Sequence, residues 1–195
     1  METVFIENKT FEKLDFKENS LNKGDYENCR FISCNFNCSD LSEIIFSDCI
    51  FSGCDLSMAN LTKTAIRDTT FRDCKMMGLN FENCNKFGLS LRFENCLLNH
   101  ASFFQIELKN TVFTKCQLQE TDFTESNVTG SLFDECDLYR AMFNQSILEK
   151  ADFRTSRNYS IDPENNRIKK AKFSYPEILG LLDKYDIETD DAGVF

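Results

Sequence analysis

The stretch Cys54-Asp55-Leu56-Ser57-Met58-Ala59-Asn60-Leu61-Thr62-Lys63 contains one five-residue pattern twice. A small residue is followed by Asp or Asn, then by a large apolar residue that we call the centre, i, and then by two further residues. A step of five matches neither the 3.6-residue period of a helix nor the two-residue period of a strand, so each unit needs a turn. The centres form two unbroken runs, the first from Phe11 to Phe81 and the second from Phe93 to Phe153.

Phenylalanine also recurs at every twentieth residue, which predicts that four units close one coil. Each coil then stacks on the previous one at the spacing of a parallel ladder, about 4.8 Å. The prediction is an all-β solenoid, a quadrilateral parallel β-helix of seven to eight coils over residues 1–157. Its four stacks of units share residue character, and the predicted core takes Phe from the first stack and the i−2 cysteines from the second: Phe31, Phe51, Phe71, Phe93, Phe113, Phe133, Phe153, Cys34, Cys54, Cys74, Cys96, Cys116 and Cys136.

Two further features complete this alignment. The third stack contains Leu21, Leu41, Leu61, Phe81, Phe103, Phe123 and Phe143, and Leu14 precedes the cysteines in the i−2 column. The stacks stay in register only if two residues are inserted within 82–92. We expect this phase break on the fourth stack, near Lys86, Phe87 and Gly88.

The ten cysteines are interpreted as core residues. Eight lie at i−2, and Cys84 would do so if the first run continued, whereas Cys38 lies elsewhere. Other i−2 positions hold Ala, Ser or Thr, so cysteine is predicted to act as a small apolar filler. The ladder lacks the C-x₂-C spacing of zinc sites, and parallel side chains are poorly placed for disulfides. We therefore expect neither a metal nor a cofactor.

Residues 158–195 are predicted to form a C-terminal extension with a helix at about 175–185 and an acidic tail. Ser174-Tyr175-Pro176-Glu177 has the pattern of a capping box. Apolar residues follow at helical spacing: Ile178, Leu179, Leu182 and Tyr185. This apolar face needs a cover. It either covers the open end of the solenoid or forms the interface of a homodimer.

Composition and motifs argue against an enzyme. The sequence has no phosphate-binding glycine loop, no HExxH and no calcium loop, and its single histidine, His100, is expected on the surface. A solenoid without long loops offers no pocket for a small-molecule substrate. No segment approaches the length of a membrane helix, and residues 1–9 do not resemble a signal peptide, so a cytoplasmic location is expected.

The net charge of −10 argues against direct binding of nucleic acid and favours a basic partner or simple solubility. Because Asp belongs to the repeat, a solvated surface is one interpretation. The other is a DNA mimic, a rod whose negative charges occupy a cationic DNA-binding surface. A continuous acidic strip would favour the mimic, and evenly scattered charges would favour a scaffold with another partner. The candidate partner-binding residues are Asp40, Asp55, Asp122, Asp137, Asp152, Lys86 and Phe87.

The pattern resembles the pentapeptide-repeat family, with Cys54–Met58, Ala59–Lys63 and Ala151–Thr155 as close matches. The resemblance implies a right-handed quadrilateral β-helix. The segment 73–81, the phase break and the segment 158–176 are similar to the albicidin-resistance group, which together with the Qnr quinolone-resistance group acts on DNA gyrase and dimerises through a C-terminal helix. The resemblance therefore implies a non-enzymatic homodimer that modulates or protects DNA gyrase or topoisomerase IV. This chain lacks the projecting loops of the Qnr group and has only the short irregularity at 82–92.

Overall fold

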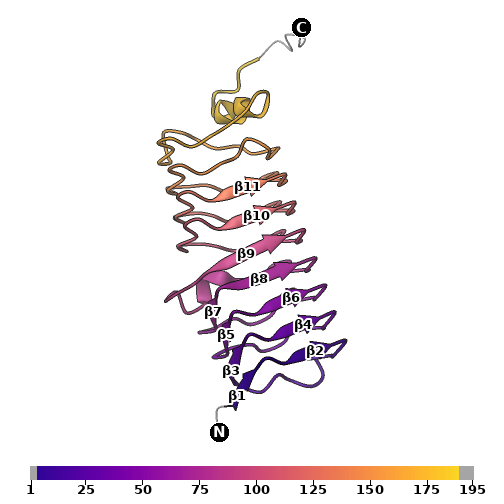
Figure 1. The fold of residues 1–195 in the computed structure, drawn as a ribbon. Helices are drawn as coiled ribbons and strands as arrows, with labels where there is room; N and C mark the ends of the chain where they lie inside the picture. Colours follow the sequence, from indigo (N-terminus) through magenta and orange to yellow (C-terminus); the bar gives the residue numbers. More distant parts are fainter. Residues whose placement is uncertain (1–3, 189–195) are drawn as a thin grey trace.

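The computed structural model describes residues 4–188 as a column of parallel coils that rises from the N-terminus to the C-terminus (Figure 1). All strand pairs are parallel and join successive coils, in a seven-stranded sheet ordered β11-β10-β9-β8-β6-β4-β2 and a four-stranded sheet ordered β1-β3-β5-β7. The strands are β1 (Val4–Glu7), β2 (Thr10–Glu12), β3 (Gly24–Glu27), β4 (Arg30–Ile32), β5 (Ile45–Ser47), β6 (Ile50–Ser52), β7 (Ala65–Arg67), β8 (Thr69–Arg72), β9 (Leu91–Glu94), β10 (Val112–Thr114) and β11 (Leu132–Asp134). The predicted parallel all-β solenoid is confirmed, with about seven coils.

The period of five arises from a turn that follows each centre. In most units the residue at i+2 has a left-handed backbone, as at Ser33 (φ 52°) and Asp48 (φ 53°). This conformation turns the chain toward the next unit of the coil, and residues with short polar side chains adopt it at low cost. The N–H groups at these turns bond to the next coil: Ser33 N–H donates to the Ser52 carbonyl over 2.8 Å. Backbone polar groups are therefore satisfied between coils.

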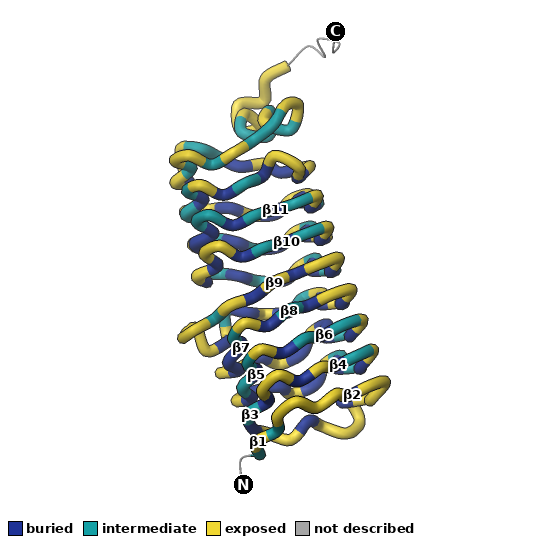
Figure 2. Tube along the Cα trace, viewed as in Figure 1, coloured by how far each residue is buried: buried dark blue, intermediate teal, exposed yellow. Residues whose placement is uncertain are grey.

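All thirteen residues of the predicted core are buried. Phenylalanine rings of the first stack lie face to face, with centroids 4.6 Å apart for Phe31 and Phe51 and 4.9 Å apart for Phe113 and Phe133. Figure 2 shows the same alternation of buried and exposed residues along coil after coil. Leu14 is the exception in its column, being 45% exposed. It lies in the first described coil, where no preceding coil covers it.

The two-residue insertion lies where the sequence predicts it. Ala65 pairs with Asn85, twenty residues later, whereas Thr69 pairs with Leu91, twenty-two residues later. The extra residues therefore fall between Asn85 and Leu91. They bulge outward while the ladder continues on both sides, because Ser90 N–H still donates to the Ile66 carbonyl.

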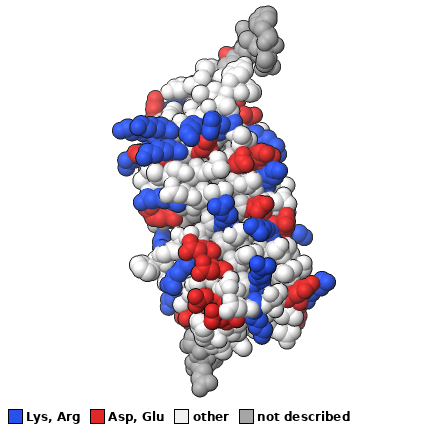
Figure 3. Space-filling view, in the orientation of Figure 1, with Lys and Arg blue, Asp and Glu red and all other residues white. Residues whose placement is uncertain are grey.

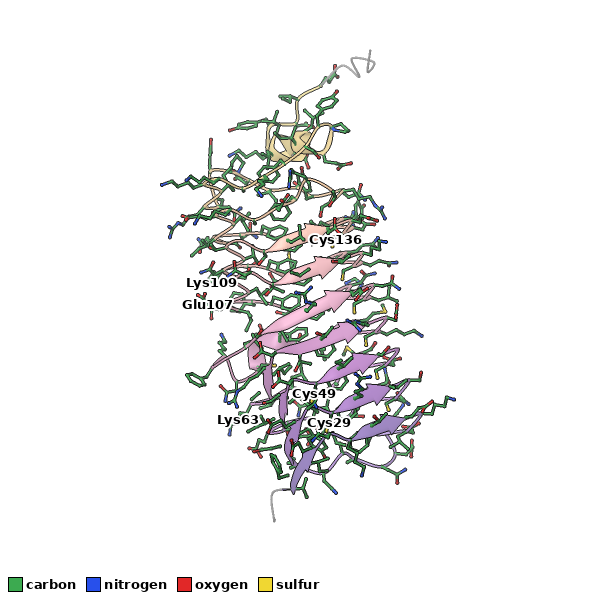
Figure 4. The ribbon with its side chains drawn as sticks, in the orientation of Figure 1. Cys29, Cys49, Lys63, Glu107, Lys109 and Cys136 are labelled. Carbon is green, nitrogen blue, oxygen red and sulfur yellow. The ribbon has the colours of Figure 1, made fainter. Side chains whose placement is uncertain are left out.

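The cysteines fill the interior. Cys29, Cys49 and Cys136 lie among the inner side chains in Figure 4. All ten cysteines are free, and all except Cys38 are buried. Their thiols contact carbonyl groups of the preceding coil, as Cys136 Sγ does with Phe113 O at 3.4 Å. Burial raises the pKa of Cys49 and Cys84 to about 12, so these thiols remain protonated.

Replacing Cys116 with Ala is expected to lower the free energy of unfolding by about 1 kcal/mol, because one buried atom is lost from an i−2 position that holds Ala in other units of the repeat. Urea titration of the purified protein measures this. A stoichiometric metal lost with Cys116, or partner binding lost without unfolding, would contradict the structural role.

The ladder continues beyond residue 157. Ile147 pairs with Arg167 and Asp152 with Lys172, and the rings of Phe153 and Phe173 stack at 5.5 Å. The five-residue pattern hides this coil because two of its centres are Asn158 and Pro163. Its interior is filled instead by Tyr159, which is out of phase with the repeat, and by Ile161, a large residue at the i−2 position of Pro163.

The C-terminal segment differs from the prediction of an α-helix at 175–185. It forms two short 3-10 helices, η2 (Glu177–Leu181) and η3 (Asp183–Tyr185), and the only other described helix is η1 (Phe81–Asn83). The predicted capping box is absent, because the Ser174 hydroxyl donates to the Arg154 carbonyl. Most backbone hydrogen bonds of the segment are short-range, such as Leu182 N–H to the Leu179 carbonyl, and the Gly180 carbonyl bonds to the last coil instead of continuing a helix.

The segment covers the end of the solenoid. Ile161 N–H donates to the Gly180 carbonyl over 3.1 Å, and Lys184 Nζ bonds to Asp162 and Glu164 over 2.7 Å each. Gly180 lies so close to the Tyr159 carbonyl that no side chain fits there. The sequence left two possible contacts for this segment, the end of its own solenoid and a second subunit. The structure contains the first of these contacts. Within residues 4–188, no helix is long and apolar enough to cross a membrane.

Candidate interaction surface

The five repeat aspartates stabilise the turns of the coils. They are Asp40, Asp55, Asp122, Asp137 and Asp152. Each carboxylate accepts a hydrogen bond from the backbone N–H two residues later, for example 3.0 Å from Ser57 to Asp55 and 2.8 Å from Thr124 to Asp122. Asn60 makes the same bond to Thr62 N–H over 3.0 Å. This is the Asx turn, in which a short side chain accepts from its own backbone.

Neighbouring groups keep several of these carboxylates ionised. The Ser42 hydroxyl holds the pKa of Asp40 below its ordinary value, with help from Lys23. Hydrogen bonds from Arg154 lower the pKa of Asp152 to about 2. Burial tends to raise the pKa of Asp137, but hydrogen bonds from Asn158 and Gln119 outweigh it and lower the pKa.

The same aspartates do not share one side of the solenoid. Asp55 and Asp137 lie in the second stack, Asp40 and Asp122 in the third, and Asp152 in the first. Lys23, Arg154 and Arg157 pair with three of them. The repeat aspartates alone therefore form no continuous acidic strip.

An acidic surface does exist on the third stack, where residues beside the repeat aspartates add to it. We define this acidic surface as the outward residues of the third stack, 20–23, 40–43, 60–63, 80–83, 102–105, 122–125, 142–145 and 162–165. Its ladder runs through Asn80, Ser102, Asp122 and Met142. Against Lys23 and Lys63 it holds seven carboxylates: Asp40, Glu43, Glu82, Asp122, Glu125, Asp162 and Glu164.

The charge of the acidic surface varies along its length. Lys23 lies 3.6 Å from Asp40, and Lys63 lies 3.7 Å from Glu43, so the lower coils are partly neutralised. Lys184 likewise pairs with the carboxylates of the last coil. In the part of the chain that the structure describes, no Lys or Arg forms an ion pair with Glu82, Asp122 or Glu125. Lys86 reaches this part of the surface through its bond to the Gln105 carbonyl, so the middle holds three unpaired carboxylates beside one lysine.

Other sides carry mixed charge. The first stack, residues 10–13 and their counterparts up to 172–175, holds six Asp and Glu against seven Lys and Arg. Figure 3 shows red and blue side chains interspersed on the side facing the viewer, with blue gathered near the C-terminal end. Residues 140–172 contain eight Lys and Arg against four Asp and Glu. The protein is therefore acidic on one stack rather than all round.

The inserted residues present one aromatic side chain to solvent. Phe87 is 80% exposed, the most of any large apolar residue in the described chain. Its N–H donates to Asn85 Oδ1 over 3.0 Å, and Lys86 Nζ donates to the Gln105 carbonyl over 3.1 Å. These two hydrogen bonds hold the base of the bulge against the solenoid, and Phe87 projects from it.

Apolar residues also gather on the outer side of the C-terminal segment. Ile178, Leu182 and Tyr185 are exposed, while Leu179 is half-buried. We call these four residues the end patch. Leu179 and Leu182 also line a hollow of about 230 Å³ together with Ile187. Within the end patch, Tyr185 also helps to hold the segment on the last coil, because its hydroxyl donates to Glu164 Oε1 over 2.9 Å.

Sequence reasoning identified the turn aspartates but missed Glu82, Glu125 and Glu164 as members of one surface. These residues occupy i+1 or i+2, positions with no preferred residue type in the repeat. Plotting the charges on the four stacks would have found them, because the predicted register already assigns each residue to a stack. His100 lies on the surface, as expected.

The protein is therefore a parallel β-solenoid built from five-residue units. A family model described as "Pentapeptide repeat region" matches residues 44–87 and 89–159, and the gap falls at Gly88 in the bulge. The chain belongs to the pentapeptide-repeat family. No curated protein matches it.

Among solved structures, the chain is similar to two trypsin-treated variants of QnrB1, described as a plasmid-mediated fluoroquinolone resistance protein. One is 19% identical with a TM-score of 0.54, covering 93% of this chain and 98% of that chain. The other is 16% identical with a TM-score of 0.52, covering 94% and 98%. At these identities the similarity establishes a shared fold.

Proposed function

We propose that this chain is a non-enzymatic, cytoplasmic interaction protein whose acidic surface binds a cationic DNA-binding surface on another protein. The excess of seven carboxylates over the two lysines of the same stack carries the proposal, and it remains an excess when Lys86 and Lys184, which reach the surface from outside the stack, are counted. A groove that binds the phosphates of DNA presents Lys and Arg, and a negative rod complements it in charge. DNA gyrase or topoisomerase IV is the proposed partner, which the protein would modulate or protect from inhibitors.

The proposal includes the finer geometry of the solenoid. A right-handed, four-sided coil would give a stiff rod in which the acidic surface occupies one flank. The whole-length similarity to QnrB1 supports this shape. Fluoroquinolone resistance is the description of QnrB1, and its transfer to this chain is part of the proposal.

We further propose that the protein is a homodimer joined through the end patch. Ile178, Leu182 and Tyr185 remain exposed although the segment already covers the last coil. A two-fold pairing would bury them against the same residues of a second copy. Two solenoids joined end to end would present two acidic surfaces on one long body.

The experiment is a supercoiling assay with purified gyrase, titrated with this protein in the presence and absence of a quinolone or albicidin. The test variant neutralises the unpaired middle of the acidic surface: Glu82→Gln, Asp122→Asn and Glu125→Gln. Asn preserves the turn, as Asn60 shows. Three exposed charges at about 0.5 kcal/mol each should weaken the effect about tenfold.

The matched control removes the same charge from the first stack through Glu94→Gln, Asp134→Asn and Glu135→Gln. It should act like the parent protein. Equal loss in both variants would contradict a role for the third stack specifically, whereas no effect of the parent protein on gyrase would contradict the partner.

The alternative is a structural or scaffold protein with an unknown protein partner. The turn bonds of the repeat aspartates favour it, because these residues are explained by the fold alone. This alternative predicts that neither triple variant changes any gyrase activity.

A further inference from the structure

Soft donor side chains gather at one edge of the second stack. Its i+2 residues in four successive coils are Cys38, Met58, Gly78 and His100, which we call the corner column. The column contains the only histidine of the chain and the only cysteine that is not buried. All four residues have left-handed backbones, with φ between 56° and 63°. A fifth residue, Met77, precedes Gly78 directly.

Hydrogen bonds between coils fix the order of this column. The N–H of Cys38 donates to Ser57 O over 3.0 Å, that of Met58 to Met77 O over 3.0 Å, and that of Gly78 to Asn99 O over 3.0 Å. Each donor residue thus lies beside the next residue of the column, one coil further along. Successive members are separated by the ladder spacing, about 4.8 Å.

Gly78 creates the space in which these donors meet. Met58 Sδ lies 2.5 Å from the point that a Cβ of Gly78 would occupy. The thioether therefore fills the place of the missing side chain and reaches one coil closer to His100. Any larger residue at 78 would displace it.

The donors line a single hollow. Met58, Met77 and His100 border a groove of about 530 Å³ whose other walls include Asp55 and Lys75. The exposed surface of this groove is mostly apolar, although it lies on a solvated side of the solenoid. His100 Nδ1 lies 3.5 Å from Glu120 Oε2, which leaves Nε2 without a carboxylate partner. A carboxylate on the other ring nitrogen is the usual second-shell arrangement of a metal-binding histidine.

We propose that this groove binds a single Cu(I) ion through Met58 Sδ, Met77 Sδ and His100. Thioether and imidazole ligands select soft monovalent copper over the hard cations that prefer carboxylates. Bonds of about 2.3 Å to sulfur and about 2.0 Å to nitrogen span roughly one step of the ladder. The proposal therefore places the ion between Met58 Sδ, which lies over Gly78, and the imidazole of His100 on the next coil, both of which border the same groove.

The site is separate from the proposed gyrase-binding surface, which uses the third stack. It also differs from the cysteine ladder, for which no metal is expected. Among the described residues, no group of three His, Cys, Asp or Glu could hold a metal ion, so the inference depends on the two methionines.

The test is a Cu(I) titration of the full chain under reducing, oxygen-free conditions in competition with bicinchoninate. One equivalent should bind, and X-ray absorption should report sulfur and nitrogen ligands. Met58→Leu and His100→Gln should each weaken binding at least about tenfold, the smallest loss seen when even an outer-shell partner is removed. Met142→Leu changes another exposed methionine, on the third stack, and should leave the affinity unchanged.

Cys38→Ser separates this site from a reactive thiol. If Cys38→Ser abolishes binding while Met58→Leu and His100→Gln bind as the parent does, copper sits on the thiol and the proposal is wrong. Unchanged affinity in all variants would also overturn it. Circular dichroism and the number of unreactive buried thiols are measured on each copper-loaded sample. They show whether the protein is still folded, and hence whether copper has entered an unfolded core.

Discussion

Phe113→Ala is expected to lower the free energy of unfolding by about 3–5 kcal/mol, the usual cost of deleting a buried phenylalanine ring. Phe113 is fully buried, and its ring stacks on Phe93 at 5.0 Å and on Phe133 at 4.9 Å. Phe103 and Phe123 contact its edges. Removing the ring therefore leaves a cavity walled by four other rings that the backbone ladder holds in place.

Urea unfolding followed by circular dichroism measures this effect. Phe87→Ala is the matched control, because the same substitution on an exposed ring should change stability by less than about 0.5 kcal/mol. Phe93→Ala should cost as much as Phe113→Ala, and it should also broaden the transition, because repeat proteins depend on contacts between neighbouring units. Midpoints equal to that of the parent would show that the stacked column contributes little.

Leu182→Glu is expected to convert the proposed dimer to a monomer at low micromolar concentration. In a two-fold interface the substitution would bring two carboxylates into an apolar contact, and buried unpaired charge is costly. Light scattering coupled to size exclusion measures the mass. Phe87→Glu adds the same charge to another exposed apolar residue, in the bulge, and should remain a dimer.

A monomeric parent protein would contradict the dimer directly. It would also weaken the DNA-mimic proposal, because one solenoid of seven or eight coils at about 4.8 Å is only about 35–40 Å long. A dimer near 75 Å would match about two turns of a DNA duplex. If the Leu182→Glu variant remained a dimer, the interface would lie outside the end patch.

The sequence predicts the core and register of this solenoid almost completely, because the ladder allows little freedom. A centre such as Phe31 must lie under Phe51, and a mismatch of even two residues at 82–92 shows directly in the phase of the pattern. The last coil is not predicted by this reasoning because Asn158 and Pro163 replace apolar centres. Its interior is filled by Tyr159, which is out of phase, and by Ile161 at an i−2 position that smaller residues occupy elsewhere.

The C-terminal segment is predicted less well for a different reason. The spacing of Ile178, Leu182 and Tyr185 is helical, but spacing does not reveal which backbone groups will bond to another element. Here the carbonyl of Gly180 is used by Ile161 of the last coil. Tertiary hydrogen bonding therefore replaces the longer helix.

The candidate surfaces depend on residues that the repeat does not constrain. Glu82 and Glu125 occupy variable positions, and their proximity depends on the stack to which they belong rather than on any motif. The groove at Gly78 is similar, because a glycine in one coil matters only through the side chain of Met58 in the coil before it.

The cover over the last coil also governs how copies of the chain can add to one another. An open β edge is a template, and a solenoid with two open edges could grow into a fibre by adding copies end to end. In the described chain, β1 and β2 are outermost at one end, whereas the segment containing η2 and η3 occupies the other. The segment containing η2 and η3 therefore blocks growth of the ladder at its end, because another copy cannot add a coil to backbone groups that the segment already covers.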